Sequence, residues 1–456
     1  MEKKAKLNIN VFKRLLSYWK LYKGLFLIAI ICTIILGVLG PLRPAILGYV
    51  VDEYISKTQN PSMLLMWILI VGGMLLFEGV FQFLSSYFSN LFAQSIIRDL
   101  RKQLMAKILT FRMSYFDRTP IGELVTRLVS DLQAITEVFS AGLMSGLGDI
   151  LAVVIAIGGM FWYDWELALL TLIPIPVLLI ATRIFARALR KSMKMEREAV
   201  NNLNTFVQER LTGMSLVQLF SRQTREYESF QEINALHRKS HVKAIWANSI
   251  FFPFVELLSS FSIALLIVYT ALKVRGFETA GAESQFGLFI AFTMWIQMLY
   301  RPIRQLADKF NIFQRGVVRA ERVFEIIDLD DHIQNEGQIV ECDFDAAINF
   351  KNVFFAYNDE EWVLRDINMT IDPGSTVAFV GATGAGKSSL VGLLGRFYEY
   401  QKGDIKVGDV AFRDIELSYL RKNIAIVLQD VFLFSDTIEQ NITLGDESIS
   451  REDIIA

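Results

Sequence analysis

The sequence predicts a membrane all-α domain of six transmembrane helices with long cytosolic extensions, followed by a partial α/β domain. Six windows are long and apolar enough to cross a bilayer, two connections between them are basic and helical, and this character ends near residue 320. The composition agrees, because 53% of the 456 residues are hydrophobic, 21% are charged and the mean hydropathy is +0.37. Soluble domains average roughly 45–50% apolar and about 25% charged residues, so we assign the excess to a lipid-facing part.

Charge and cysteine content exclude several classes of protein. The formal net charge is −2, which argues against a general nucleic-acid binder, because such a protein needs a basic face. The two cysteines, Cys32 and Cys342, are far apart in the sequence. They cannot make a disulfide framework or a cysteine-rich metal site.

Each of the six windows meets the length that a bilayer demands. A hydrocarbon core about 30 Å thick needs roughly 20 mostly apolar helical residues. Before the first window, residues 1–23 mix basic side chains with apolar and aromatic ones, which is typical of a cytosolic or interfacial helix. We expect the transmembrane domain to cover residues 24–315. The windows are 24–50, 63–84, 141–162, 167–184, 250–272 and 286–298 with its continuation.

The charges of the connections indicate the orientation. Lysine and arginine gather after the second window and after the fourth. Because basic loops stay on the cytosolic side, we expect both connections, both termini and the C-terminal domain to be cytoplasmic. Each basic connection is predicted to be a helical hairpin, interrupted near 114–122 in the first and near 211–219 in the second. Each hairpin tip is expected to contact something below the membrane.

A few polar residues lie within the apolar windows. Intramembrane charge is costly, so such groups usually face a cavity or pair with one another. A wall of a substrate pathway is one interpretation, and structural pairs or side chains that snorkel near a helix end are an equally good one. The residues are Arg43, Glu78, Gln82, Glu256 and Gln297.

The C-terminal part has the character of a soluble α/β domain. An acidic linker is expected over 316–345, and the domain itself over 346–456. Short β-rich runs predict strands at 348–357, 363–371, 376–380 and 424–428, and a helix is expected at 390–397.

The third of these runs leads into a phosphate-binding motif. Its residues fit the pattern G-x-x-x-x-G-K-[ST] between a strand and a helix, which is typical of a P-loop NTPase. Glycines let the backbone N–H groups point at a phosphate, and the helix N-terminus adds partial positive charge. Lys387 is expected to reach the β- and γ-phosphates, and the hydroxyl of Ser388 to bind Mg²⁺. The motif is Gly381-Ala382-Thr383-Gly384-Ala385-Gly386-Lys387-Ser388-Ser389.

Two further residues are candidates for the same site. Tyr357 ends a predicted strand, where its ring could stack on adenine, although core packing alone would explain it. Gln429 follows the last predicted strand, where it could reach Mg²⁺ and the attacking water, although a surface glutamine is the plainer interpretation. Both depend on the phosphate-binding motif.

Taken together, the chain resembles an ABC exporter half-transporter of the multidrug or lipid-flippase type. The resemblance covers the whole chain. Tyr115-Phe116-Asp117 matches the family's first coupling-helix region, Phe355-Ala356-Tyr357 its A-loop, Gly381–Ser389 its Walker A motif, and Val427-Leu428-Gln429-Asp430 its Q-loop.

The resemblance implies an ATP site with Mg²⁺. Lys387 and Gln429 would act in catalysis, Ser388 and Gln429 would bind the metal, and Gln429 would link it to the coupling helices. It also implies a second half-transporter as partner, lipid or another hydrophobic compound as substrate, and no nucleic acid. The nucleotide-binding residues implied are Tyr357, Gly381, Ala382, Thr383, Gly384, Ala385, Gly386, Lys387, Ser388, Ser389 and Gln429.

Three family motifs are absent from the sequence. We find no LSGGQ-like signature, no Walker B strand ending in Asp-Glu and no switch histidine, and with them no general base. We therefore interpret the chain as a C-terminally truncated fragment whose P-loop domain is partial. The chain alone is not expected to hydrolyse ATP, whereas the full-length protein is.

The predicted function is ATP-driven export or flipping of hydrophobic or amphipathic compounds by a dimer, in a bacterial plasma membrane. An ATP-binding, non-hydrolysing regulatory half of a heterodimer is the alternative. A glutamate directly after the Walker B aspartate would favour the pump, and another residue there the regulatory half.

Overall fold

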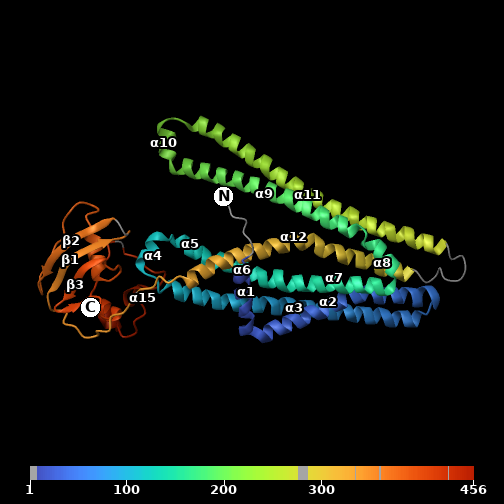
Figure 1. The fold of residues 1–456 in the computed structure, drawn as a ribbon, viewed down its shortest axis with the longest axis horizontal. Coiled ribbons are helices and arrows are strands. Elements are labelled where there is room, and N and C mark those ends of the chain that lie inside the picture. The colour runs from blue at the N-terminus through green and yellow to red at the C-terminus, as the bar shows by residue number, and fades with distance from the viewer. Residues whose placement is uncertain (1–7, 276–285, 334, 359–360, 430, 456) are drawn as a thin grey trace. The chain divides into compact units, whose positions relative to one another are not determined.

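A computed structural model describes residues 8–275, 286–333, 335–358, 361–429 and 431–455 (Figure 1). The chain divides into two compact units. The helical unit comprises Met1–Met105 and Val125–Asp328, and the mixed unit comprises Ala106–Leu124 and Leu329–Ala456. The tip of the first predicted hairpin therefore belongs to the same unit as the C-terminal part of the chain.

The helical unit consists of long helices joined by short turns. Three stretches of it, η2, η3 and η4, are π-helical and continue neighbouring α-helices. Its elements, of which α3 and α5 extend into residues of the mixed unit, are α1 (Ile9–Ser17), η1 (Tyr18–Tyr22), α2 (Lys23–Val50), η2 (Val51–Lys57), α3 (Pro61–Ile108), α5 (Ile121–Thr126), η3 (Arg127–Asp131), α6 (Leu132–Glu137), η4 (Val138–Met144), α7 (Ser145–Tyr163), α8 (Trp165–Leu172), α9 (Pro174–Thr212), α10 (Met214–Leu219), α11 (Gln223–Arg275) and α12 (Phe286–Asp328).

Within the described residues, six helical stretches are long and apolar enough to cross a membrane, and each contains one predicted window. This confirms the fold class, since a six-helix membrane region precedes a small antiparallel sheet. The stretches are Ile9–Lys57, Pro61–Ile108, Ile121–Tyr163, Trp165–Thr212, Gln223–Leu272 and Phe286–Asp328.

The N-terminal helix α1 packs against α12. The Arg14 guanidinium donates to both carboxylate oxygens of Asp328, at 2.5 and 2.8 Å, and lies 4.2 Å from the ring centroid of Phe324. The ring of Phe12 meets that of Phe313 edge-on at 6.1 Å. Residues 1–7 of the predicted interfacial segment lie outside the described residues.

The core of the helical unit forms around α12. Phe292, Trp295 and Tyr300 on this helix are each at most 1% exposed and pack with residues of α7, α8 and α11. The Trp295 indole N–H donates to the carbonyl of Pro41 at 2.9 Å, which ties α12 to α2. Proline inside α2 is tolerated because neighbouring helices in a membrane protein supply partners for the backbone groups it frees.

Three of the five polar residues in the predicted windows form ion pairs. Arg43 donates to Glu78 at 2.9 Å, which links α2 to α3. Glu256 accepts from Arg304 at 3.2 Å, which links α11 to α12. These contacts favour the structural-pair interpretation for Arg43, Glu78 and Glu256, whereas Gln82 and Gln297 are exposed.

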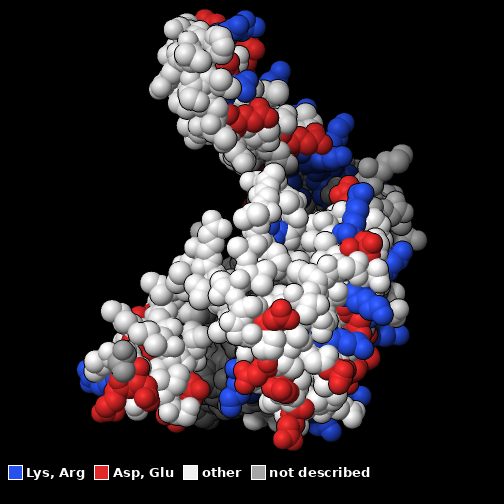
Figure 2. Space-filling view, turned by 90° about the vertical axis from the view of Figure 1, so that its left-hand side faces the viewer, with Lys and Arg blue, Asp and Glu red and all other residues white. Residues whose placement is uncertain are grey.

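The second basic connection forms a hairpin that diverges from the other helices of its unit (Figure 1). Its arms are the end of α9 and the beginning of α11, and α10 forms its tip, where the sequence predicts an interruption. The tip exposes large apolar side chains, with Leu219 74% and Phe220 68% exposed. Figure 2 shows the outer end of this hairpin uppermost, with a mostly uncharged face and its charges along one side.

The mixed unit contains a sheet of order β2-β1-β3-β4 among its described residues, and all pairs are antiparallel. Ile348 of β1 stands opposite Ile371 of β2 and Val407 of β3. The strands are β1 (Ile348–Ala356), β2 (Trp362–Ile371), β3 (Lys402–Val407) and β4 (Val410–Ala411), and the helices are α4 (Met113–Arg118), α13 (Lys387–Leu394), α14 (Leu417–Asn423), α15 (Ile438–Thr443) and α16 (Arg451–Ile455).

The strands predicted at 376–380 and 424–428 are wrong. The structure places both segments outside any strand, and Val380 and Val427 are 91% and 96% exposed. An apolar run becomes a strand only where a neighbouring segment pairs with its N–H and C=O groups. Neither segment finds a ladder partner among the residues that the structure describes.

Candidate functional site

The loop at 381–386 has the backbone that a phosphate cradle requires. Gly384 and Gly386 adopt φ angles of +87° and +88°, where a residue with a Cβ is strained. A Cβ at Gly386 would also lie 2.7 Å from the Leu364 side chain. Glycine is therefore needed at 386 for both reasons, and residues 381–385 are exposed.

Lys387 begins α13 and reaches back across the loop. Its Nζ donates to the carbonyls of Gly381 and Ala382, both at 2.9 Å. The ammonium is therefore held over the loop, beside the N–H groups of the helix N-terminus. This arrangement concentrates positive charge where an anion would bind.

Tyr357 and the phosphate-binding motif are brought together, as the sequence predicts. The Tyr357 hydroxyl lies 2.8 Å from Oγ of Ser389, the last residue of the motif. Its ring is flanked edge-on by Phe355, at 4.8 Å between centroids, and by Tyr398, at 5.0 Å. Tyr357 is nevertheless 40% exposed, so part of its ring remains accessible to a ligand.

Gln429 directly follows the segment 424–428 that was predicted as the last strand. It is exposed, and no hydrogen bond joins it to the phosphate-binding motif within the described part of the chain. Its neighbour in the predicted Q-loop, Asp430, lies outside the described residues. Ser388 is exposed at the start of α13, where its hydroxyl is accessible to a metal ion.

The first hairpin tip contacts the aromatic cluster around Tyr357. The Tyr398 hydroxyl donates to Asp117 of α4 at 2.9 Å, and Arg118 donates to the Tyr357 carbonyl at 2.9 Å. Burial first, and then the hydrogen bond to Asp117, raise the pKa of Tyr398. A cavity of about 710 Å³ lies between α4 and the end of β1.

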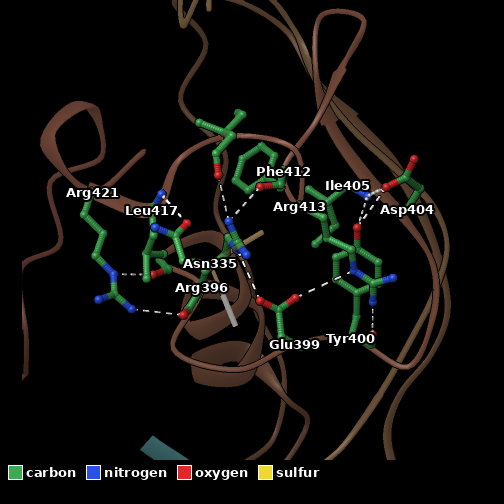
Figure 3. Close-up of polar contacts among 12 residues, drawn as sticks. Asn335, Arg396, Glu399, Tyr400, Asp404, Ile405, Phe412, Arg413, Leu417 and Arg421 are labelled. Atoms are coloured by element: carbon green, nitrogen blue, oxygen red, sulfur yellow. Dashed lines mark hydrogen bonds and ion pairs between the residues drawn. The ribbon is translucent and has the colours of Figure 1, made fainter. Parts of the chain in front are cut away.

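Tyr398 was missed in the sequence because it lies in no recognised motif. It belongs to the segment 395–401 between α13 and β3, which three arginines hold in place (Figure 3). Arg396 donates to the carbonyls of Phe412 and Ile415, at 3.2 and 2.9 Å. Arg421 donates to the carbonyls of Gly395 and Arg396, at 3.1 and 3.0 Å. Arg413 stacks on the Tyr400 ring at 3.9 Å and donates to its carbonyl.

Two family patterns match the chain. The pattern described as the ABC transporter transmembrane region matches residues 26–303, and the one described as ABC transporter matches residues 364–455. The first covers more than half of the chain, and the second includes the phosphate-binding motif.

Individual relatives align along nearly the whole chain. An ATP-dependent lipid A-core flippase of Syntrophus aciditrophicus is 31% identical over 449 residues, which are 98% of this chain and 73% of the flippase. Another lipid A-core flippase, from Albidiferax ferrireducens, is 30% identical over 453 residues, covering 98% of this chain and 76% of its own. An uncharacterized ABC transporter ATP-binding protein of Bacillus subtilis is 29% identical over 445 residues, covering 97% and 73%.

These matches agree with the order of the elements in the described part of the chain, in which six membrane-length helices precede the glycine-containing loop 381–386. The chain therefore belongs to the ABC transporter family and has the organisation of an exporter half-transporter.

Proposed function

We propose that this chain takes part in ATP-driven export or flipping of lipids or other hydrophobic compounds across a membrane. The observation that carries the proposal is the joining of a phosphate cradle to six membrane-length helices on one chain. The flippase names of two relatives support a lipid as substrate.

The residues of the cradle suit a magnesium nucleotide. Lys387 would exchange the carbonyls of Gly381 and Ala382 for the β- and γ-phosphates, which are stronger acceptors for an ammonium. The accessible hydroxyl of Ser388 is an oxygen donor of the kind that Mg²⁺ prefers. When bound, the metal would neutralise phosphate charge, and Gln429 would approach it by a movement of its own segment.

Tyr357 would contact the adenine base. Its ring is partly exposed and its hydroxyl is bonded to Ser389, so base and phosphates would be recognised side by side. Stacking of a base on an aromatic ring contributes about 1–3 kcal/mol. Through the two hydrogen bonds described above, Arg118 and Tyr398 would couple nucleotide binding at this site to the position of α4.

A second half-transporter would complete the transporter. The exposed apolar tip around α10 supports this, because large apolar side chains at the end of a long hairpin are typical of a protein contact. The basic connections support a cytoplasmic position for both hairpin tips and for the nucleotide site, in a bacterial plasma membrane. With a partner, closure around ATP would pull the hairpins and change the side of the membrane to which the paired membrane helices open.

Reconstitution tests this proposal. The full-length protein in liposomes should hydrolyse ATP and move fluorescent lipid between leaflets, and Lys387→Ala should abolish both. ATPase activity that Lys387→Ala leaves intact would contradict the assigned site. Nucleotide binding without turnover in any lipid would instead favour the non-hydrolysing regulatory half.

A further inference from the structure

The side chain of Gln401 continues the β1–β3 ladder beyond its last backbone pair. Phe354 of β1 stands opposite Lys402 of β3, and the Gln401 backbone N–H donates to the Phe354 carbonyl at 3.0 Å. The segment 395–400, which leads from α13 to this point, does not belong to β3 and does not extend the ladder to the end of β1. The Gln401 amide takes over, because Oε1 accepts from Ala356 N–H at 3.0 Å and Nε2 donates to the Ala356 carbonyl at 2.8 Å.

A primary amide can replace a peptide group in this role. It offers an acceptor and a donor side by side, as a neighbouring strand does. Both backbone groups of Ala356 are therefore paired, directly before Tyr357. The Tyr357 carbonyl accepts a hydrogen bond from Arg118. The backbone that carries the Tyr357 side chain is therefore held both before and after its Cα.

Gln401 is in turn held by its neighbours. Lys402 belongs to β3, and the preceding segment is anchored by Arg396, Arg413 and Arg421 (Figure 3). The backbone of Gln401 is therefore held in place, and its side-chain amide can align Ala356.

We propose that Gln401 is a positioning residue for nucleotide binding, which aligns Tyr357 with the base through Ala356. The proposal rests on the proposed contact between Tyr357 and adenine. Gln401 itself touches no phosphate-binding residue among its described contacts. Substitution of Gln401 should therefore weaken recognition of the base and leave binding of the phosphates unchanged.

The variants at Gln401 form a graded series. Leucine has a similar size and forms neither bond to Ala356. Glutamate keeps an acceptor for the Ala356 N–H but sets a carboxylate against the Ala356 carbonyl. Asparagine is one methylene shorter and falls short of the strand. Gln338→Leu is the matched control, because Gln338 is an exposed glutamine in the same unit.

The experiment measures the affinity of the full chain for a fluorescent ATP analogue and, by competition, for tripolyphosphate. Gln401 is exposed, so its two hydrogen bonds compete with water and their loss should weaken ATP binding about three- to tenfold. Gln401→Leu should leave tripolyphosphate affinity unchanged, and Gln338→Leu should change neither affinity. Gln401→Glu should fall between Gln401→Leu and the unaltered chain.

A double-mutant cycle separates this inference from the proposed function. If Gln401 acts only through Tyr357, Gln401→Leu should have no further effect in the Tyr357→Ala background. Weaker binding by Tyr357→Ala alone, with Gln401→Leu unchanged, would overturn the role of Gln401 and keep the base contact. Additive losses, or equal losses for tripolyphosphate, would also overturn it. Unchanged ATP affinity in Tyr357→Ala would remove the base contact and this inference with it.

Discussion

The two short helices α4 and α10 each have six residues and interrupt the two basic hairpins in the same way, yet their surroundings differ. Helix α4 belongs to the mixed unit, where Asp117 and Arg118 bind Tyr398 and the Tyr357 carbonyl. Helix α10 belongs to the helical unit and exposes Leu216 and Leu219, and Phe220 directly after it is exposed as well.

The difference lies in the kind of contact that each tip can make. Directional hydrogen bonds join helix α4 to Tyr398 and to the candidate nucleotide-binding residue Tyr357. A displacement of either side would therefore displace the other. Helix α10 presents apolar area, which stabilises an association without fixing one geometry. We infer that α4 reports on the site of its own chain, whereas α10 is available to a partner chain. Three predictions test this comparison.

The largest effect is expected from a charge placed on the α10 tip. Leu219→Asp should weaken pairing of two chains about 100-fold or more, because burying an unpaired carboxylate against apolar surface costs several kcal/mol. The measurement is the dimer dissociation constant in detergent, by analytical ultracentrifugation. Ser215→Asp adds the same charge to a polar position of α10 and is the control. Equal pairing by Leu219→Asp and Ser215→Asp would break the proposed role of this tip.

An intermediate effect is expected where α4 meets the aromatic cluster. Tyr398→Ala removes a half-buried ring that packs on Phe355 and Tyr357, and should cost about 2 kcal/mol of local stability. Hydrogen exchange of the α4 and β1 amides measures this loss. Tyr398→Phe keeps the ring and loses only the bond to Asp117, so its loss should be smaller. Unchanged α4 protection in both variants would mean that the cluster does not hold α4.

The smallest effect is expected from alkaline pH. The pKa of Tyr398 is raised above its ordinary value of 10.0, chiefly by burial. A raised pKa means that the neutral hydroxyl stabilises the folded form below pH 10.0, and this contribution is lost as pH rises through the folded pKa. Above about pH 10, the thermal midpoint should fall more steeply in the unaltered chain than in Tyr398→Phe. Parallel curves would contradict the raised pKa of Tyr398, and dimerisation through α10 should not follow this titration.

The membrane helices and the phosphate loop could be predicted because each depends on residues that are close together in the sequence. A window of about 20 apolar residues crosses a bilayer whatever surrounds it, and Gly384 and Gly386 require φ angles that other residues avoid. The same local rules misassigned 376–380 and 424–428, because a strand depends on a neighbour that no single segment encodes.

The parts of the site that were missed depend on contacts between distant segments. Tyr398 matters because of Asp117, 281 positions away, and Gln401 because of Ala356, 45 positions away. Neither residue type is unusual for its place in the sequence. The ion pair of Arg43 with Glu78 was left open for the same reason, since the sequence offers both a pathway and a pair.

The central claim is that the loop at 381–389 binds a magnesium nucleotide, and calorimetric titration of the full chain with ATP tests it most directly. We predict saturable binding that magnesium strengthens and that Lys387→Ala weakens at least about tenfold, because an ammonium bonded to phosphate contributes roughly 1.5–3 kcal/mol. Binding that is absent in the unaltered chain, or equal in Lys387→Ala, would contradict the account.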